Sequence, residues 1–137
     1  MSKVPVLQTL EETREFFKND RFATENGMVI ESVEARHAVI RLDLAQLHRN
    51  AAGGVMGGVM FTMSDFACAV GANFGGNGTY VSIDSNISFI SGCRGKTLFA
   101  ESVCLRSGKT LDFYEVTVRD ELGNLVSKAS FTMYKVS

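Results

Sequence analysis

GGVMGGVMFTMSDFACAVGA, residues 53–72, is an almost entirely apolar segment with a single carboxylate, Asp65, near its middle. Between Asn50 and Cys93 the only formally charged side chains are Asp65 and Asp84. An ionised carboxylate surrounded by Phe, Met, Val and Ala is costly in free energy unless it is paired, hydrogen-bonded or protonated. The segment therefore predicts a helix that is buried on all sides, whose one acid is either compensated by a partner or used in chemistry.

The same segment is long enough to cross a membrane, but its composition argues against that interpretation. Four glycines fall in its first six residues, and Asp65 would lie at the centre of the bilayer. We therefore expect a helix buried inside a folded domain, running from Gly57 or Gly58 to about Phe74. The sequence GGNG, residues 75–78, is typical of a helix C-terminus.

Residue patterning on both sides of this helix predicts one short helix and six strands. Residues 7–18 are amphipathic, with Thr9 as the N-cap and Glu12 at the capping-box position. The sequences KNDRFATENG (18–27) and AQLHRNAAGG (45–54) have no periodicity and predict a linker and a loop. The remaining patterns predict strands over residues 28–35, 37–44, 80–90, 97–106, 110–120 and 125–136.

The strand at residues 80–90 alternates between apolar and polar side chains. We expect one face to carry Val81, Ile83, Ile87 and Phe89, and the other to carry Ser82, Asp84, Asn86 and Ser88. The sequences GCRGK (92–96), SGK (107–109) and ELGN (121–124) predict turns, so that the last four strands form an antiparallel meander. The element order predicts a single α+β domain, residues 1–137, in which a curved antiparallel sheet wraps one long helix.

Composition and motifs exclude several classes of partner and site. The net charge of −1 and the isoelectric point near 6.1 give no electrostatic basis for binding nucleic acid or an anionic membrane. The first residues lack the apolar core of a signal peptide, so we expect a cytoplasmic protein whose three cysteines are small core residues. Metal-site spacing, phosphate loops, dinucleotide fingerprints and serine-hydrolase elbows are absent from the sequence. We expect no metal and no organic cofactor.

Asp65 has no helical neighbour that could neutralise it. The residues three and four positions away are Phe61, Thr62, Cys68 and Ala69, so any partner must come from another part of the fold. Desolvation raises the pKa of a carboxyl group and strengthens the carboxylate as a base, so Asp65 is suited to activate water or to attack an electrophile itself.

The glycine-rich start of the helix supplies the complementary group. Bare N–H groups at a helix N-terminus, that of Gly57 above all, are suited to bind a developing oxyanion. Eight residues of α-helix separate Gly57 from Asp65 by about 12 Å, whereas a base acting on water beside the bound carbonyl needs to lie roughly 6 Å from the donor. Two antiparallel helices of a symmetric dimer would bring Gly57 of one chain toward Asp65 of the other. We therefore predict two composite sites across a twofold interface.

Three further residues allow a structural explanation as well as a functional one. Asn50 is either a ligand-holding residue or an ordinary loop residue, and Ser82 is either a partner of the site or one member of an alternating strand. A histidine base would have to be His48, which lies in a polar loop and is expected to be exposed to solvent.

Two stretches of the chain resemble one family. HRNAAGGVMGGVMFTMSDFACAVGA, residues 48–72, is similar to the N-x-x-G-x-x-H-G-G signature and acid-bearing helix of hotdog-fold acyl-CoA thioesterases of the phenylacetic-acid-degradation and acyl-CoA thioesterase 13 type. VSIDSNISFISGCRGKTLFAES, residues 81–102, resembles the V-S-x-D-x-N strand and following turn of the same family. The similarity spans residues 28–135 and implies a hotdog fold of the 4-hydroxybenzoyl-CoA thioesterase superfamily.

The resemblance also implies roles for particular residues. Asp65 would be the general base or the nucleophile, and the Gly57 amide would polarise the thioester carbonyl. Asn50 would help to hold that carbonyl, and Ser82 would orient the water.

Four more positions would contact the substrate. Met56 and Gly58 lie in the glycine-rich entrance, where Met56 replaces the histidine that the family usually has and that assists at the thioester. Arg106 and Lys109 flank a hairpin and resemble positions that meet the phosphates of CoA.

The family acts as homodimers, often paired into dimers of dimers, with each site shared between subunits. The leading interpretation is hydrolysis of an aryl- or medium- to long-chain acyl-CoA to CoA and a free acid. Because Met56 replaces the histidine, a non-catalytic acyl-CoA-binding or regulatory protein is the alternative. An enoyl-CoA hydratase is disfavoured, since it typically needs an Asp–His pair and no histidine follows His48.

Overall fold

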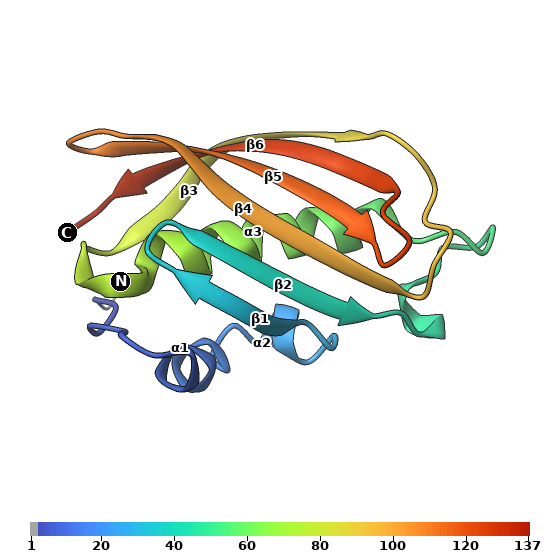
Figure 1. Cartoon of the computed structure of the whole chain (residues 1–137), viewed down its shortest axis with the longest axis horizontal. Helices are drawn as coiled ribbons and strands as arrows, with labels where there is room; N and C mark the ends of the chain where they lie inside the picture. Colours follow the sequence, from blue (N-terminus) through green and yellow to red (C-terminus); the bar gives the residue numbers. More distant parts are fainter. Residues whose placement is uncertain (1–2) are drawn as a thin grey trace.

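The computed structural model describes residues 3–137 as a six-stranded sheet curved around one long helix (Figure 1). The helices are α1 (Leu10–Phe17), α2 (Arg21–Thr24) and α3 (Gly57–Asn73), and two 3-10 segments are η1 (Gln46–His48) and η2 (Phe74–Gly76). The strands are β1 (Val29–Glu34), β2 (His37–Asp43), β3 (Tyr80–Phe89), β4 (Thr97–Ser107), β5 (Leu111–Asp120) and β6 (Leu125–Lys135).

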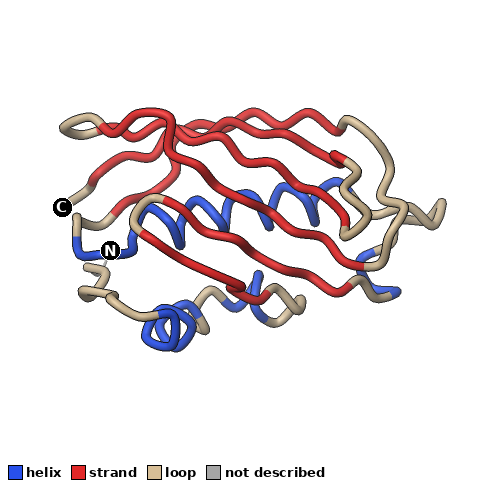
Figure 2. Tube along the Cα trace, in the orientation of Figure 1, coloured by secondary structure: helices blue, strands red, loops and turns tan. Residues whose placement is uncertain are grey.

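All neighbouring strands of the sheet are antiparallel, in the order β1-β2-β4-β5-β6-β3. The sheet curves over α3, which runs along its inner face, while α1 and α2 lie near the β1 edge (Figures 1 and 2). A curved antiparallel sheet wrapped around one central helix, with a short N-terminal helix beside it, confirms the predicted hotdog fold.

The apolar composition of α3 follows from its enclosure by the sheet. Met63, Ala67, Cys68 and Val70 have no exposed surface, and they belong to one core with inward side chains of the strands, among them Ile40, Leu98, Val116 and Phe131. Within residues 3–137 no helix combines the length and hydropathy needed to span a membrane.

The close approach of α3 to the sheet depends on Gly71. A Cβ at this position would lie 3.1 Å from the backbone nitrogen of His37 and 3.2 Å from Ser102 Oγ. The Gly71 carbonyl accepts the N–H of Arg36 at 3.0 Å, and Ser102 Oγ donates to the Ala67 carbonyl at 2.8 Å. Helix and sheet therefore meet here through backbone contacts that leave no room for a side chain.

The prediction of a four-strand meander is wrong in one connection. β4, β5 and β6 pair in succession, but β3 pairs with β6 and β4 pairs with β2. Residues 90–96, which contain GCRGK, therefore cross between non-adjacent strands instead of forming a tight turn. Asp120 Oδ2 accepts the N–H groups of Arg94 and Gly95 at 2.9 and 3.1 Å, and the Glu121 carboxylate accepts that of Lys96. Turn-like composition predicted a change of direction here but not the strand that the chain joins next.

A β-bulge at Ile83 overturns the predicted alternation of β3. The pairing with β6 shifts register between Ser82 and Asp84, so the extra residue exchanges the two faces of the strand. Before the bulge Ser82 faces α3, whereas after it Asp84 lies opposite the outward-facing Thr132. Ile83 itself is 57% exposed. Ser82 therefore does not share a face with the three later polar residues of the strand.

The N-terminal segment confirms the predicted cap but adds a helix. α1 begins at Leu10, later than expected, and Thr9 Oγ1 accepts the N–H of Glu12 at 3.1 Å while the Glu12 carboxylate accepts the N–H of Thr9. The predicted linker contains α2, and the predicted loop contains η1. Each is about one turn long, which is too short for a periodic pattern to reveal.

Replacing Gly71 by valine should destabilise the protein by about 3 kcal/mol, because the added methyl groups meet the backbone of His37, which cannot move aside. Gly92→Val is the matched control, since a Cβ at Gly92 meets nothing within 4 Å. Urea unfolding measures both. Equal loss of stability in the two variants would contradict the close approach at Gly71.

Candidate active site

Asp65 lies in the middle of α3, half-buried, and its partner is tertiary as predicted. The Ser82 hydroxyl on β3 donates to Asp65 Oδ1 at 3.1 Å. Among residues 3–137 no Lys, Arg or His forms an ion pair with Asp65. Burial raises the pKa of Asp65 above its ordinary value, and the hydrogen bond from Ser82 lowers it in part. Asp65 therefore holds a proton more tightly than a solvated Asp and has no counterion.

Two open cavities meet at Asp65. The first, which we call the helix cleft, has a volume of about 340 Å³ and lies between α2 and α3, where Phe61 forms part of its wall. The second, the strand cleft, has a volume of about 300 Å³ and lies between α1, α3 and the first residues of β3, including Ser82. Asp20, just before α2, lines both clefts together with Asp65. A small molecule or water can therefore reach the carboxyl group from either side.

Gly57 begins α3 with its N–H groups uncapped by a side chain. Met56 is the N-cap residue and its side chain makes no capping hydrogen bond, so the N–H groups of Gly57 and Gly58 have no intrahelical partner, whereas that of Val59 donates to the Met56 carbonyl at 2.9 Å. The ring of Phe89 packs over Gly57, where a Cβ would lie 2.9 Å from the tip of the ring. Gly57 and Phe89 line a third cavity of about 570 Å³, the entrance pocket, which also contains Cys93.

Gly57 and Asp65 do not share a cavity within one chain. Among the described residues, Asp65 lines the two clefts and Gly57 lines the entrance pocket only. Both belong to the same uninterrupted helix, so eight residues, or about 12 Å, separate them along its axis. One chain alone therefore does not bring the oxyanion donor and the base to the same reacting group.

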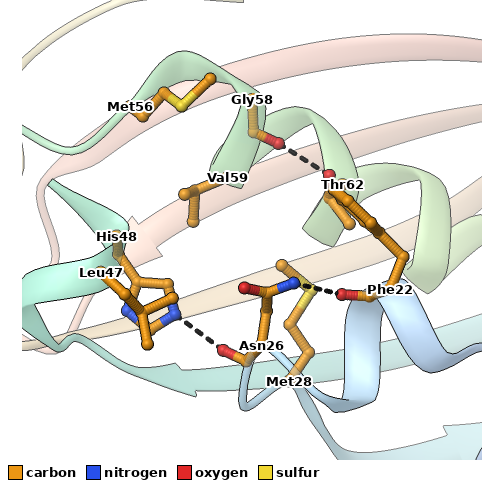
Figure 3. A pocket seen from close by; sticks show the side chains of 9 residues that line it. All are labelled: Phe22, Asn26, Met28, Leu47, His48, Met56, Gly58, Val59 and Thr62. Carbon is orange, nitrogen blue, oxygen red and sulfur yellow. Dashed lines mark hydrogen bonds between the residues drawn. The ribbon is translucent and has the colours of Figure 1, made fainter. Parts of the chain in front are cut away.

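An apolar slot of about 180 Å³ adjoins the helix cleft near the N-terminus of α3 (Figure 3). The slot and the helix cleft share Phe22 and Thr62. Two donors in the slot are already engaged: Thr62 Oγ1 donates to the Gly58 carbonyl at 2.8 Å, and Asn26 Nδ2 donates to the Phe22 carbonyl at 2.6 Å. The rest of the wall consists largely of Met28, Leu47, Met56 and Val59. Such a slot is suited to an apolar group.

His48 is buried, contrary to the expectation of solvent exposure. Its side chain is 4% exposed, and both ring nitrogens are occupied. Nδ1 accepts the N–H of Ala45 at 2.9 Å, and Nε2 lies 2.7 Å from the Asn26 carbonyl. Because a backbone N–H only donates and a carbonyl only accepts, the neutral ring carries its proton on Nε2. His48 therefore holds the loop before α3 and is not a free base.

Asn50 organises the glycine-rich loop that leads into α3. Its Oδ1 accepts the N–H groups of Ala52 and Gly54, each at 3.0 Å. Met56, which is 56% exposed, and Gly58 follow this loop and line the apolar slot. The structure thus places Asn50, Met56 and Gly58 around the start of α3. Of the two roles that the sequence allowed for Asn50, these hydrogen bonds support the structural one, as a loop residue.

Arg106 and Lys109 do not lie with the other candidate residues in one chain. Both are exposed, and neither lines the clefts, the slot or the entrance pocket. The β4–β5 hairpin that carries them lies at the end of the sheet near the C-terminus, whereas α3 begins at the opposite end (Figure 1).

The contribution of α2 to the site was missed from the sequence. Asp20 lines both clefts, and Phe22 lies between the helix cleft and the slot. An Asp before RFAT is a possible N-cap signal, but a helix of four residues offers no periodicity to support it. Within residues 3–137 there is no group of three or more His, Cys, Asp or Glu side chains placed to hold a metal ion.

Comparison with known proteins gives a family and several relatives. Residues 52–127, more than half of the chain, match the model of the family described as the thioesterase superfamily. A protein of Archaeoglobus fulgidus whose name includes the word esterase is 26% identical over 133 residues, which cover 95% of this chain and 85% of that protein.

Two solved structures extend the comparison. The PaaI protein of E. coli, from the phenylacetic acid degradation operon, is 20% identical with a TM-score of 0.84, and the match covers 94% of this chain and 97% of that one. At that identity the likeness concerns the fold. The smu.793 protein of Streptococcus mutans UA159, solved bound to acetyl CoA, is 26% identical with a TM-score of 0.73, over 81% of this chain and 90% of that one.

Replacing Ser82 by alanine should raise the pKa of Asp65 further, because the hydroxyl stabilises the carboxylate and not the protonated acid. Carbon-13 NMR of the Asp65 carboxyl group, titrated with pH, measures the change. Ser88→Ala, on the same strand but beyond the bulge, is the control and should leave the titration unchanged. An unaltered Asp65 titration in Ser82→Ala would contradict the assigned hydrogen bond.

Proposed function

Since this chain belongs to the thioesterase superfamily and is a thioester hydrolase, we propose that it hydrolyses acyl-CoA with Asp65 as general base and the Gly57 amide as oxyanion donor. The observation that carries the proposal is the state of Asp65. It is a half-buried carboxylate with a raised pKa, one hydroxyl partner and two open clefts beside it. A structural acid in an apolar helix would instead be sealed from solvent by its partners.

The chemistry follows from these groups. A water in the strand cleft, within reach of Asp65 and Ser82, loses a proton to Asp65 as its oxygen attacks the thioester carbonyl carbon. Negative charge then develops on the carbonyl oxygen, where the N–H of Gly57 and the positive end of the helix dipole stabilise it. The carbon–sulfur bond breaks, its electron pair goes to sulfur, and the proton taken up by Asp65 is returned to give the CoA thiol beside the free acid. Direct attack by Asp65 uses the same placement: it expels the thiolate and forms an anhydride, which water then hydrolyses to the acid.

The two groups act together across a twofold dimer in this proposal. Their separation of about 12 Å along one helix and their positions in different cavities support it. In a pair of antiparallel α3 helices, the entrance pocket of one subunit would open onto the clefts of the other. Each dimer then has two equivalent sites.

The apolar slot is proposed to receive the acyl group. It adjoins the helix cleft through Phe22 and Thr62, and the side-chain donors of Asn26 and Thr62 already have partners. Its volume of about 180 Å³ is comparable to an engineered cavity of roughly 150 Å³ that binds benzene. An aryl or medium-length acyl group therefore fits better than a long fatty chain. The acetyl CoA bound to the S. mutans relative supports a CoA ester as substrate.

A non-catalytic acyl-CoA-binding protein is the second candidate, and one observation favours it. Met56 stands at the start of α3 with an exposed thioether, which cannot transfer a proton. A protein of this kind would retain the slot and the clefts but would release no CoA.

Asp65→Asn should lower kcat for acyl-CoA hydrolysis by at least about 100-fold, because the amide cannot accept a proton from water. Asp84→Asn, which changes an exposed Asp on the outer face of the same strand that bears Ser82, should retain wild-type kcat. Release of free CoA thiol, followed with a thiol reagent, measures both. Full activity in Asp65→Asn would exclude the assignment, and tight binding of acyl-CoA by an inactive wild type would favour the second candidate.

The acyl chain should set kcat/KM through the size of the slot. Benzoyl-, phenylacetyl- and hexanoyl-CoA are expected to be better substrates than palmitoyl-CoA, and Val59→Phe, which narrows the slot, should lower kcat/KM for these three by about tenfold. Acetyl-CoA is the internal control, because its methyl group does not fill the slot. A variant that lost activity equally on acetyl- and hexanoyl-CoA would contradict this placement of the acyl group.

A further inference from the structure

A second carboxyl group, Asp20, faces the same cavities as Asp65. Both residues line the helix cleft and the strand cleft. Asp20 is the N-cap residue of α2, yet its side chain makes no capping hydrogen bond. Within the part of the chain that the structure describes, it forms no ion pair. The α1–α2 connection therefore presents this carboxyl group to the clefts and not to the helix that it begins.

The groups around Asp20 favour its protonated form. Asp20 remains exposed where it lines the clefts, and its partial desolvation by the cleft walls, followed by the negative charge of Asp65, raises its pKa. Arg21, the cationic residue among those that line the helix cleft, is paired with Glu25. In the strand cleft, Tyr80 is the other titratable group, and burial raises its pKa as well.

The two carboxyl groups are unequal in their hydrogen bonds. Asp65 accepts the Ser82 hydroxyl, which stabilises its ionised form, whereas no donor in residues 3–137 binds the side chain of Asp20. Two neighbouring carboxyl groups resist double ionisation, so a proton taken up by the pair resides first on the member without a donor. Asp65 is thus the base of the pair and Asp20 the acid.

We propose that Asp20 is a second catalytic residue, which protonates the departing sulfur while Asp65 takes the proton of the attacking water. This inference rests on the proposed thioesterase function. As the water oxygen bonds to the carbonyl carbon, one water proton passes to Asp65. As the carbon–sulfur bond breaks, its electron pair goes to sulfur and the proton of Asp20 follows. Transfer of the proton from Asp65 to Asp20 then restores both groups, and the net reaction is thioester plus water to acid plus thiol.

Other side chains near the site are less suited to this task. Both ring nitrogens of His48 are held by backbone groups, and Met56 carries no exchangeable proton. The thiol of Cys68 is buried in the core, where its pKa is raised. Asp20 therefore supplies the proton donor that the start of α3 lacks.

The test compares two leaving groups in wild type, Asp20→Asn and Asp20→Glu. One substrate is the acyl-CoA that wild type hydrolyses fastest, and the other is the 4-nitrothiophenyl ester of the same acid, whose thiolate is stable without a proton. Asp20→Asn should lose about 100-fold in kcat on the CoA ester but less than about threefold on the aryl thioester, and Asp20→Glu should recover most of the loss. Thermal unfolding of each variant and Asp43→Asn, an exposed Asp on β2, are the controls.

The outcomes separate this inference from the proposed function. Equal losses on the two esters, or none on the CoA ester, would overturn the role of Asp20 as proton donor, even if Asp65→Asn is inactive. Absence of hydrolysis by wild type would overturn the proposed function itself. Should Asp20→Asn fail to fold, Asp20→Ser decides between the outcomes, because serine also removes the acid and should lower kcat on the CoA ester but not on the aryl thioester.

Discussion

The candidate site depends on an ionisable group held at the edge of the hydrophobic core, with no counterion among residues 3–137. Asp65 lies between Ser64 and Phe66, which are buried, and the hydroxyl of Ser82 is its one hydrogen-bond partner in the described chain. The hydrogen bond from Ser82 stabilises the ionised carboxylate in the folded protein. It lowers the pKa of Asp65 by less than burial raises it, so the pKa stays above its ordinary value. A Lys or Arg at Ser82 would neutralise the acid and lower its affinity for a proton.

The enclosure of α3 imposes a second constraint. The sheet packs around α3, and Gly71 brings the helix into close contact with the β1–β2 turn. The helical geometry therefore fixes the spacing of the groups along α3. Gly57 and Asp65 therefore stay about 12 Å apart along the helix axis, and they line different cavities. Under the proposed mechanism, the fold that creates the reactive acid also makes a second subunit necessary for its use.

Local patterns in the sequence predicted the elements well, but not how they come together. The apolar run with one acid predicted α3 and a tertiary partner for Asp65, and Thr9 with Glu12 predicted the cap of α1. The bulge at Ile83 could not be predicted from the sequence, because a residue is extra only relative to the strand with which it pairs, here β6. The pairing of β3 with β6, the burial of His48 and the place of Asp20 in the clefts likewise depend on contacts between distant segments.

Complementation between two inactive chains tests the shared site most directly. One chain carries Asp65→Asn, and the other carries Gly57→Pro, which removes the N–H at the first helical position. The extended backbone of Met56 suits a following proline, and the Phe89 ring over Gly57 must shift to admit the pyrrolidine ring. If each site joins Gly57 of one subunit to Asp65 of the other, an equal mixture refolded together should regain about a quarter of wild-type activity, since half of the dimers are mixed and each mixed dimer has one intact site. A mixture as inactive as either parent, with mixed dimers shown to form, would contradict the account.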